Sequence, residues 1–347
     1  VGSVSSLDAL EPYRRAVLSH IDVEAVRDAG LRVALDPGNG VAGLVAPSVA
    51  VRLGCEVQTV NVDVDGRFPG RDSEPRPDNL DGLRALVEAS GADVGVAFDG
   101  DGDRSIFVDE LGEVHWGDRS FALVARDYLS RNPGVDVATP VSSSRVIEDV
   151  VTEGGGSVVW TRVGSVDVSR TMVESGIALG GEENGGIMYG PHLAVRDGCM
   201  ALALMCHYVA TRKLPLSDLI KEQPNLSKDR DKVPCPNLLK EEALKVLSEN
   251  ADAPEVNTLD GVKLVYDDGS WVLFRPSGTE PIFRVYAESD SDERVRELIE
   301  KHKVLVKKVV DDLNAAQRAS IESGDSYIED YNRVLSRWWE QEKQSCE

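Results

Sequence analysis

The chain has 347 residues, of which 41% are hydrophobic and 28% are charged, and this composition excludes a largely disordered or fibrous protein. Its formal net charge of −22 argues against a protein that wraps nucleic acid or coats an anionic membrane. The length exceeds the roughly 250–300 residues that one hydrophobic core supports, so we expect more than one domain.

The first part of the chain predicts an α/β domain, to which we assign residues 1–133. Short apolar runs alternate there with segments of helical periodicity, a pattern typical of a sheet with parallel strands. The predicted strands are 31–35, 55–62, 93–98 and 105–109, and the predicted helices are 46–53 and 80–89.

The same alternation restarts near residue 134 and predicts a second α/β domain over residues 134–226. Its predicted strands are 135–141, 157–161 and 177–179, and its predicted helices are 146–151, 168–175 and 200–210. Residues 224–236 are polar and contain prolines, which indicates a linker.

A smaller α+β domain is predicted over residues 227–314, followed by an appended helical tail over 315–347. The domain combines helices at 241–248 and 292–313 with strands at 261–266, 271–275 and 283–289. In the tail, apolar side chains at helical spacing predict an amphipathic helix that packs on the body, with a partner-docking helix as the alternative: Ile328, Tyr331, Leu335 and Trp338.

The strongest motif is Asp99-Gly100-Asp101-Gly102-Asp103-Arg104, which directly follows a predicted buried strand. Glycines let such a loop fold tightly, so the three carboxylates can converge on a hard cation such as Mg²⁺. Arg104 could brace a phosphate beside that cation. One alternative is a solvated acidic turn. Another is an EF-hand loop, which Arg104 at the sixth position and the strand-like flanks disfavour.

Two further loops carry polar groups. In Gly181-Glu182-Glu183-Asn184-Gly185-Gly186, carboxylates and an amide could hold the hydroxyls of a sugar, although a plain surface turn explains the string equally well. In Arg275-Pro276-Ser277-Gly278-Thr279-Glu280-Pro281, an arginine, two hydroxyls and backbone N–H groups could grip a phosphate. The alternative there is a proline-bounded turn.

Together and in this order, the three motifs resemble those of the α-D-phosphohexomutase superfamily, which includes phosphoglucomutase, phosphomannomutase and phosphoglucosamine mutase. The resemblance runs from about residue 7 to 313 and is closest to the archaeal-type branch. It implies two consecutive α/β domains with mixed, mostly parallel sheets, then a smaller α+β domain like the TATA-box-binding protein.

The resemblance also implies an isomerase that acts as an intramolecular phosphotransferase, moving a phosphoryl group between O1 and O6 of a hexose through a bisphosphate. The roles it implies are Mg²⁺ binding by Asp99, Asp101 and Asp103, a place beside a phosphoserine for Arg104, sugar binding by Glu182 and Asn184, and phosphate binding by Arg275, Ser277, Gly278 and Thr279. Gly186 departs from the many members that carry a histidine there.

One larger departure concerns the nucleophile. The family's serine loop, a Thr-Ala-Ser-His-Asn-Pro-like string, is absent from residues 1–347. We therefore expect the chain to correspond to domains II, III and IV and to be inactive without a serine-bearing domain. A variant of this hypothesis is that a separate chain supplies that domain. The alternative is a non-catalytic sugar-phosphate-binding relative. An odd number of cysteines without any Cys-x-x-Cys favours the reducing cytoplasm, and we expect neither nucleic acid nor membrane as a partner.

Overall fold

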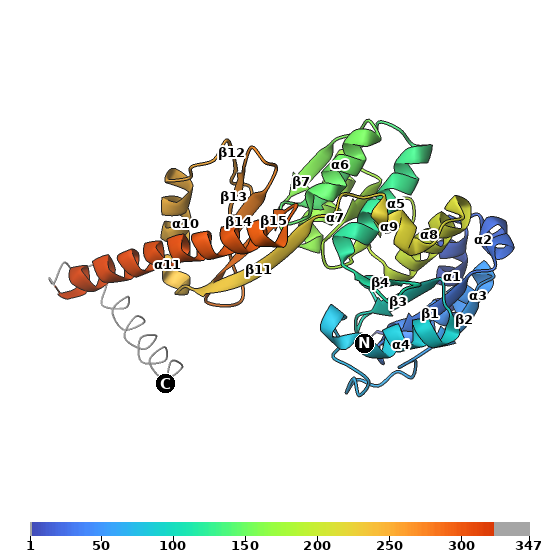
Figure 1. Cartoon of the computed structure of the whole chain (residues 1–347). Helices are drawn as coiled ribbons and strands as arrows, with labels where there is room; N and C mark the ends of the chain where they lie inside the picture. Colours follow the sequence, from blue (N-terminus) through green and yellow to red (C-terminus); the bar gives the residue numbers. More distant parts are fainter. Residues whose placement is uncertain (1, 323–347) are drawn as a thin grey trace. The chain divides into compact units, whose positions relative to one another are not determined.

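The computed structural model describes residues 2–322 of the chain and contains three five-stranded sheets in sequence order (Figure 1). The chain divides into two compact units, of which the first ends at Leu226 and the second begins at Ser227. Each unit is described by itself below. Within the described residues, no helix has the length and the apolar character that crossing a membrane requires.

The first sheet lies in the first unit and has the strand order β2-β1-β3-β4-β5. Strands β1, β2 and β3 pair in parallel, whereas β4 and β5 run antiparallel. The strands are β1 (Arg32–Asp36), β2 (Glu56–Thr59), β3 (Val94–Phe98), β4 (Ser105–Asp109) and β5 (Val114–His115). The helices are α1 (Leu10–Leu18), α2 (Val23–Ala29), η1 (Val41–Leu44), α3 (Ala46–Leu53), η2 (Pro77–Asn79) and α4 (Asp81–Ser90).

The second sheet of this unit has the order β10-β9-β8-β6-β7, again with two parallel and two antiparallel pairings. Its strands are β6 (Val137–Pro140), β7 (Val158–Thr161), β8 (Leu179–Gly181), β9 (Ile187–Tyr189) and β10 (Leu193–Arg196). The helices are α5 (Gly117–Arg131), α6 (Arg145–Glu153), α7 (Ser165–Ser175), α8 (Gly198–Arg212) and α9 (Leu216–Lys221). Helix α8 is buried from Gly198 to Ala210, because it packs against α2, α3 and α5 and contributes to one core shared by both sheets.

The second unit is built on an antiparallel sheet with the order β11-β15-β14-β13-β12. Its strands are β11 (Ser227–Pro234), β12 (Glu255–Asn257), β13 (Val262–Val265), β14 (Trp271–Pro276) and β15 (Ile282–Ser289). Its helices are η3 (Asn237–Leu239), α10 (Lys240–Glu249) and α11 (Asp292–Glu322). Apolar side chains of α10 and α11 cover the sheet and form a separate core with it.

The predicted fold class is confirmed: two mixed α/β sheets precede an antiparallel sheet with helices. The predicted linker at 224–236 is wrong, because β11 occupies most of it and pairs with β15 along its whole length. This strand lies at the edge of its sheet and carries consecutive charged residues of alternating sign at 228–232. Its sequence therefore lacks the apolar pattern that predicts a strand. Helix α11 also continues past residue 313 into the predicted tail, while the apolar positions from Ile328 onward lie outside the described residues.

Candidate functional site

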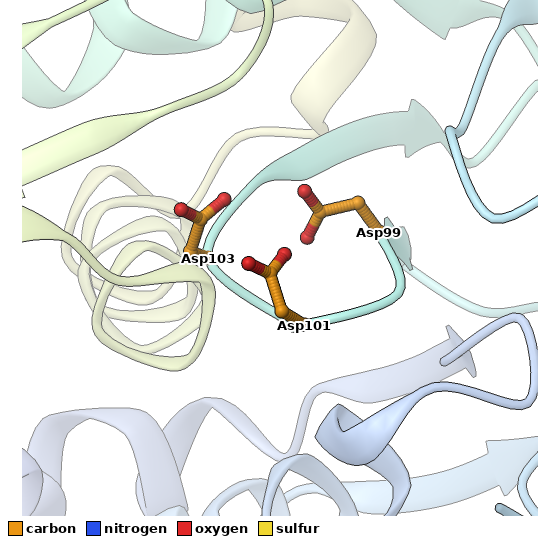
Figure 2. A group of neighbouring side chains, drawn as sticks. All are labelled: Asp99, Asp101 and Asp103. Carbon is orange, nitrogen blue, oxygen red and sulfur yellow. The ribbon is translucent and has the colours of Figure 1, made fainter. Parts of the chain in front are cut away.

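The acidic loop (residues 99–104) connects the antiparallel strands β3 and β4 and brings three carboxylates together. Figure 2 shows the side chains of Asp99, Asp101 and Asp103 converging on the space inside the loop. One oxygen from each lies within 4.8 Å of the others. The turn is possible because Gly102 adopts a positive φ of 73° and its N–H bonds to the Asp99 carbonyl at 3.1 Å.

The charges within the acidic loop are only partly balanced. Burial alone would raise the pKa of Asp99, but hydrogen bonds from Arg104 hold that pKa below its ordinary value. Burial raises the pKa of Asp103 to about 6, with Asp99 and Asp101 adding to the rise and Arg196 opposing it. Oδ1 of Asp103 is buried without a hydrogen-bond partner in the described part of the chain. An all-oxygen set with one unsatisfied oxygen fits a hard divalent cation such as Mg²⁺.

Arg104 closes the acidic loop rather than extending freely from it. Its Nε donates to Oδ2 of Asp99 at 2.6 Å, and its Nη1 donates to Oε1 of Glu74 at 3.2 Å. The side chain is 21% exposed, so part of the guanidinium faces solvent beside the three carboxylates. This position suits an arginine that contacts both the loop and an anionic ligand.

Beneath the acidic loop lies a buried ion pair that the sequence analysis missed. Nε of Arg71 donates to Oδ2 of Asp36 at 2.8 Å, and the two side chains are 3% and 1% exposed. Nη2 of Arg71 donates to the Phe98 carbonyl at 2.6 Å, immediately before Asp99. Arg71 therefore fixes the point at which the acidic loop leaves β3, but nothing in its local sequence distinguishes it from the exposed Arg67.

The glycine-rich loop (residues 181–186) lies beside the acidic loop. The amide of Ser105, the first residue of β4, donates to the Gly185 carbonyl at 3.0 Å. Glu182 is only 4% exposed, and burial raises the pKa of its carboxyl group. The Asn184 side chain accepts a hydrogen bond from the Gly186 amide at 3.2 Å. The structure thus brings Glu182 and Asn184, both predicted to bind sugar, to the loop predicted to bind metal.

Arg196 links these two loops, a role that the sequence analysis did not assign to it. Its Nη2 lies 2.6 Å from Oδ2 of Asp103, and its Nη1 lies 3.4 Å from Oε2 of Glu182. Arg196 and Asp103 also border an open groove of about 450 Å³. The groove is lined by Asp103, Ser165, Val166, Ser169, Arg170, Val195 and Arg196. The arrangement offers guanidinium and hydroxyl groups next to the acidic loop, where a polar ligand could lie.

The hydroxyl loop (residues 275–281) joins β14 to β15 in the second unit. The Ser277 side chain is buried, and its oxygen accepts hydrogen bonds from the amides of Thr279 at 3.4 Å and Glu280 at 3.2 Å. Arg275 is paired with Asp260 at 2.6 Å, and nothing lies within 4 Å of the position of a Cβ on Gly278. Lys240, which the sequence analysis missed, donates to the Ser277 and Glu280 carbonyls and so fixes the turn from below.

Comparison with known families places models of three phosphoglucomutase/phosphomannomutase domains on the chain. They are alpha/beta/alpha domain II over residues 11–112, alpha/beta/alpha domain III over residues 116–226 and the C-terminal domain over residues 232–302. Together these models match more than half of the chain.

Individual proteins agree with the family models. A phosphoglucomutase/phosphomannomutase of Thermococcus kodakarensis is 39% identical over 86% of this chain and 66% of its own length. A probable phosphoglucosamine mutase of Methanopyrus kandleri is 40% identical over 88% of this chain and 67% of its own length. Among solved structures, a phosphoglucomutase/phosphomannomutase family protein of Burkholderia thailandensis superposes with a TM-score of 0.80 at 30% identity, covering 89% of this chain and 66% of that one. The chain thus spans about two thirds of the length of these proteins.

Proposed function

Because the chain belongs to the α-D-phosphohexomutase superfamily, with sequence matching domains II, III and IV, we propose that it interconverts hexose 1-phosphate and hexose 6-phosphate. The observation that carries the proposal is the joining of the acidic loop to the glycine-rich loop through Arg196. A cation site and a sugar-hydroxyl site that share one guanidinium suit a phosphorylated sugar. The named relatives make glucose, mannose and glucosamine phosphates the candidate substrates.

In this proposal the acidic loop holds Mg²⁺ through Asp99, Asp101 and Asp103. When bound, the ion would supply positive charge that offsets the charge of a phosphoryl group in transfer. Arg104 contributes a second positive charge at the rim of the loop and contacts the phosphoryl group bound to serine. Its hydrogen bond to Asp99 fixes the orientation of the guanidinium before a ligand arrives, which reduces the entropy cost of binding.

The remaining groups would position the sugar and its second phosphate. Glu182 is an acceptor for sugar hydroxyls, because its buried carboxylate has few competing donors, and Asn184 lies two residues away. In the second unit, the hydroxyl loop would grip the phosphate that is not reacting, through Arg275, Ser277, Gly278 and Thr279. The open space beside Gly278 and the exposed Thr279 support this role, since a phosphate needs room and donors.

The phosphoryl-carrying serine is proposed to lie outside residues 1–347, and the reaction to pass through a hexose bisphosphate. We assign residues 1–133 to domain II, 134–226 to domain III, 227–314 to domain IV and 315–347 to the appended tail. The cytoplasm is the proposed compartment, because the cysteines of the described part are free and buried: Cys55, Cys199, Cys206 and Cys235.

Calorimetry on the purified chain tests the proposal. Glucose, mannose and glucosamine 1-phosphates are titrated in Mg²⁺, and each mixture is then assayed for the 6-phosphate with and without the first domain of the Thermococcus relative. We expect binding by the chain alone and turnover only after the added domain. Absence of binding to all three sugars would overturn the proposed substrate class, and turnover by the chain alone would overturn the external serine.

A second candidate function is non-catalytic binding of sugar phosphates. The observation in its favour is the absence of the serine string from the 347 residues. The same assay separates the two functions, because a binder holds the sugar phosphate but produces no 6-phosphate with any added serine domain. Binding without turnover would therefore favour this second function over the first.

A further inference from the structure

Arg196 is shared between two carboxylates that have different predicted ligands. Asp103 belongs to the candidate cation site, and Glu182 belongs to the candidate sugar site. The guanidinium lies 2.6 Å from the first carboxylate and 3.4 Å from the second, and the arginine side chain is 23% exposed. The guanidinium lies between two carboxylates, so a stronger contact with one of them weakens its contact with the other.

The backbone around Arg196 is held firmly, so its side chain rather than its backbone is free to respond. The carboxylate of the next residue, Asp197, accepts the amide of Met200 at 2.9 Å and the hydroxyl of Tyr13 at 2.6 Å. The amide of Gly198 donates to the Gly102 carbonyl at 3.2 Å, which ties the start of α8 to the acidic loop. These contacts fix the position from which Arg196 reaches both loops.

The glycine at position 186 leaves the space that Arg196 needs. A Cβ built on Gly186 would lie 2.3 Å from Cδ of Arg196, a separation that real Cβ atoms do not show. A side chain at 186 and the observed path of Arg196 therefore exclude each other. The departure at Gly186 noted in the sequence thus has a structural counterpart, since the arginine stem fills the place of the missing side chain.

We propose that Arg196 couples cation binding at the acidic loop to sugar binding at Glu182. Arg196 occupies Oδ2 of Asp103, while Oδ1 is buried and has no hydrogen-bond partner in the described part of the chain. A cation held by Asp99, Asp101 and Asp103 would repel the guanidinium and so weaken its contact with Asp103. The guanidinium would then shift toward Glu182 and orient that carboxylate as an acceptor for a sugar hydroxyl. By thermodynamic reciprocity, sugar bound at Glu182 strengthens cation binding.

The first test measures the cation alone and is independent of the proposed function. Mn²⁺ affinity of the full chain, measured by electron paramagnetic resonance, is compared among the wild type, Arg196→Gln, Arg196→Lys and Arg170→Gln. Arg170 lines the same groove but, among the described residues, makes no ion pair with the acidic loop, so its variant controls for general loss of positive charge. Arg196→Gln replaces the guanidinium beside Asp103 with a neutral amide, and this change should tighten Mn²⁺ binding by about three- to tenfold.

The lysine variant and the Arg170 variant should both stay within about twofold of the wild type, because the first keeps the charge at position 196 and the second does not touch Asp103. Unchanged or weaker Mn²⁺ binding in Arg196→Gln overturns the proposed competition at Asp103. Circular dichroism on each variant confirms that the fold is retained.

The second test measures the coupling and rests on the proposed function. Mn²⁺ affinity is determined with glucosamine 1-phosphate and with an equal concentration of inorganic phosphate, so that direct binding of phosphate to the metal is subtracted. The sugar phosphate should tighten Mn²⁺ binding about fivefold more than phosphate does in the wild type, and this difference should vanish in Arg196→Gln. An equal difference in both proteins overturns the coupling. If neither glucosamine 1-phosphate nor the other hexose phosphates bind, the proposed function fails, whereas the cation test still decides the contact with Asp103.

Discussion

The buried pair of Arg71 and Asp36 offers the sharpest test of how the acidic loop is supported. Arg71→Met keeps an unbranched apolar stem that reaches the position of Nε, but it removes the guanidinium with its charge and donors. Four hydrogen bonds are lost, to the Asp36 carboxylate at 2.8 Å and to the carbonyls of Asp36, Phe98 and Asp72 at 3.0, 2.6 and 3.0 Å. Because the Asp36 carboxylate stays buried without its cation, we expect a loss of about 3–5 kcal/mol in the free energy of unfolding.

Arg67→Met is the matched control, since Arg67 lies in the same segment and also pairs with an aspartate, Asp65, at 2.9 Å. Its side chain is 87% exposed, so solvent screens the pair and we expect little change in the free energy of unfolding. Adding Asp36→Asn to Arg71→Met should recover part of the loss, because the uncompensated buried charge is then absent.

Amide hydrogen exchange read by mass spectrometry is the appropriate assay, because the chain has two compact units and a single unfolding midpoint would mix them. Peptides covering β1 and β3 report the unit of interest, and peptides of β14 serve as an internal reference. Equal protection losses in Arg71→Met and Arg67→Met would refute the argument from burial. A double variant no more stable than Arg71→Met would refute the uncompensated charge as its cause.

Three further outcomes concern a histidine, the acidic loop and a close backbone contact. Burial lowers the pKa of His302 below 6.5, so the unfolded chain binds more protons as the pH falls, and the second unit should lose stability below about pH 6.5. His302→Gln should remove that slope in urea curves followed by pulsed hydrogen exchange of the β14 peptides. Asp101→Asn should weaken Mn²⁺ binding at least about tenfold, and unchanged Mn²⁺ affinity would contradict the metal site. The same variant should raise the melting temperature of the metal-free chain by about 1–3 °C, because it relieves repulsion among three carboxylates. Gly198→Ala should lower the free energy of unfolding by about 1–3 kcal/mol, because its Cβ would lie 2.7 Å from the Gly102 carbonyl oxygen of the acidic loop. As a control, Gly82→Ala places a Cβ with nothing within 4 Å and should stabilise α4 by up to about 1 kcal/mol.

Local sequence signals predicted the elements that depend on local contacts. Helix α3 has the predicted bounds, with a proline in its first turn, and β4 has the predicted bounds as well. The acidic loop was recognisable because glycine alternates with aspartate directly after a buried strand. In each case the physical cause lies within about ten residues of sequence, which is the range over which capping, periodicity and turn chemistry act.

The elements and residues that were missed depend on distant partners. Strand β11 is stabilised by β15, more than forty positions further along the chain, and its own alternation of lysine, aspartate and arginine resembles a loop. Arg71 and Arg196 are single arginines whose meaning comes from Asp36, Asp103 and Glu182 in other elements. Pairings of this kind leave no local pattern, so the sequence singled out the three polar loops as candidates but did not indicate which residues connect the acidic loop to the glycine-rich loop.

The charge balance at the joined loops has a consequence for the order in which ligands bind. Three guanidinium groups, those of Arg76, Arg104 and Arg196, face five carboxylates. The five carboxylates are those of Glu74, Asp99, Asp101, Asp103 and Glu182.

All three arginines already pair with these carboxylates, which still outnumber them. The cation-free site therefore repels an anionic sugar phosphate, as does the net charge of −22. A divalent cation would offset the remaining negative charge and, in the proposed coupling, would weaken the contact of Arg196 with Asp103. Under the proposed function the cation therefore binds before the sugar phosphate, because the charge of the cation-free acidic loop repels the phosphate.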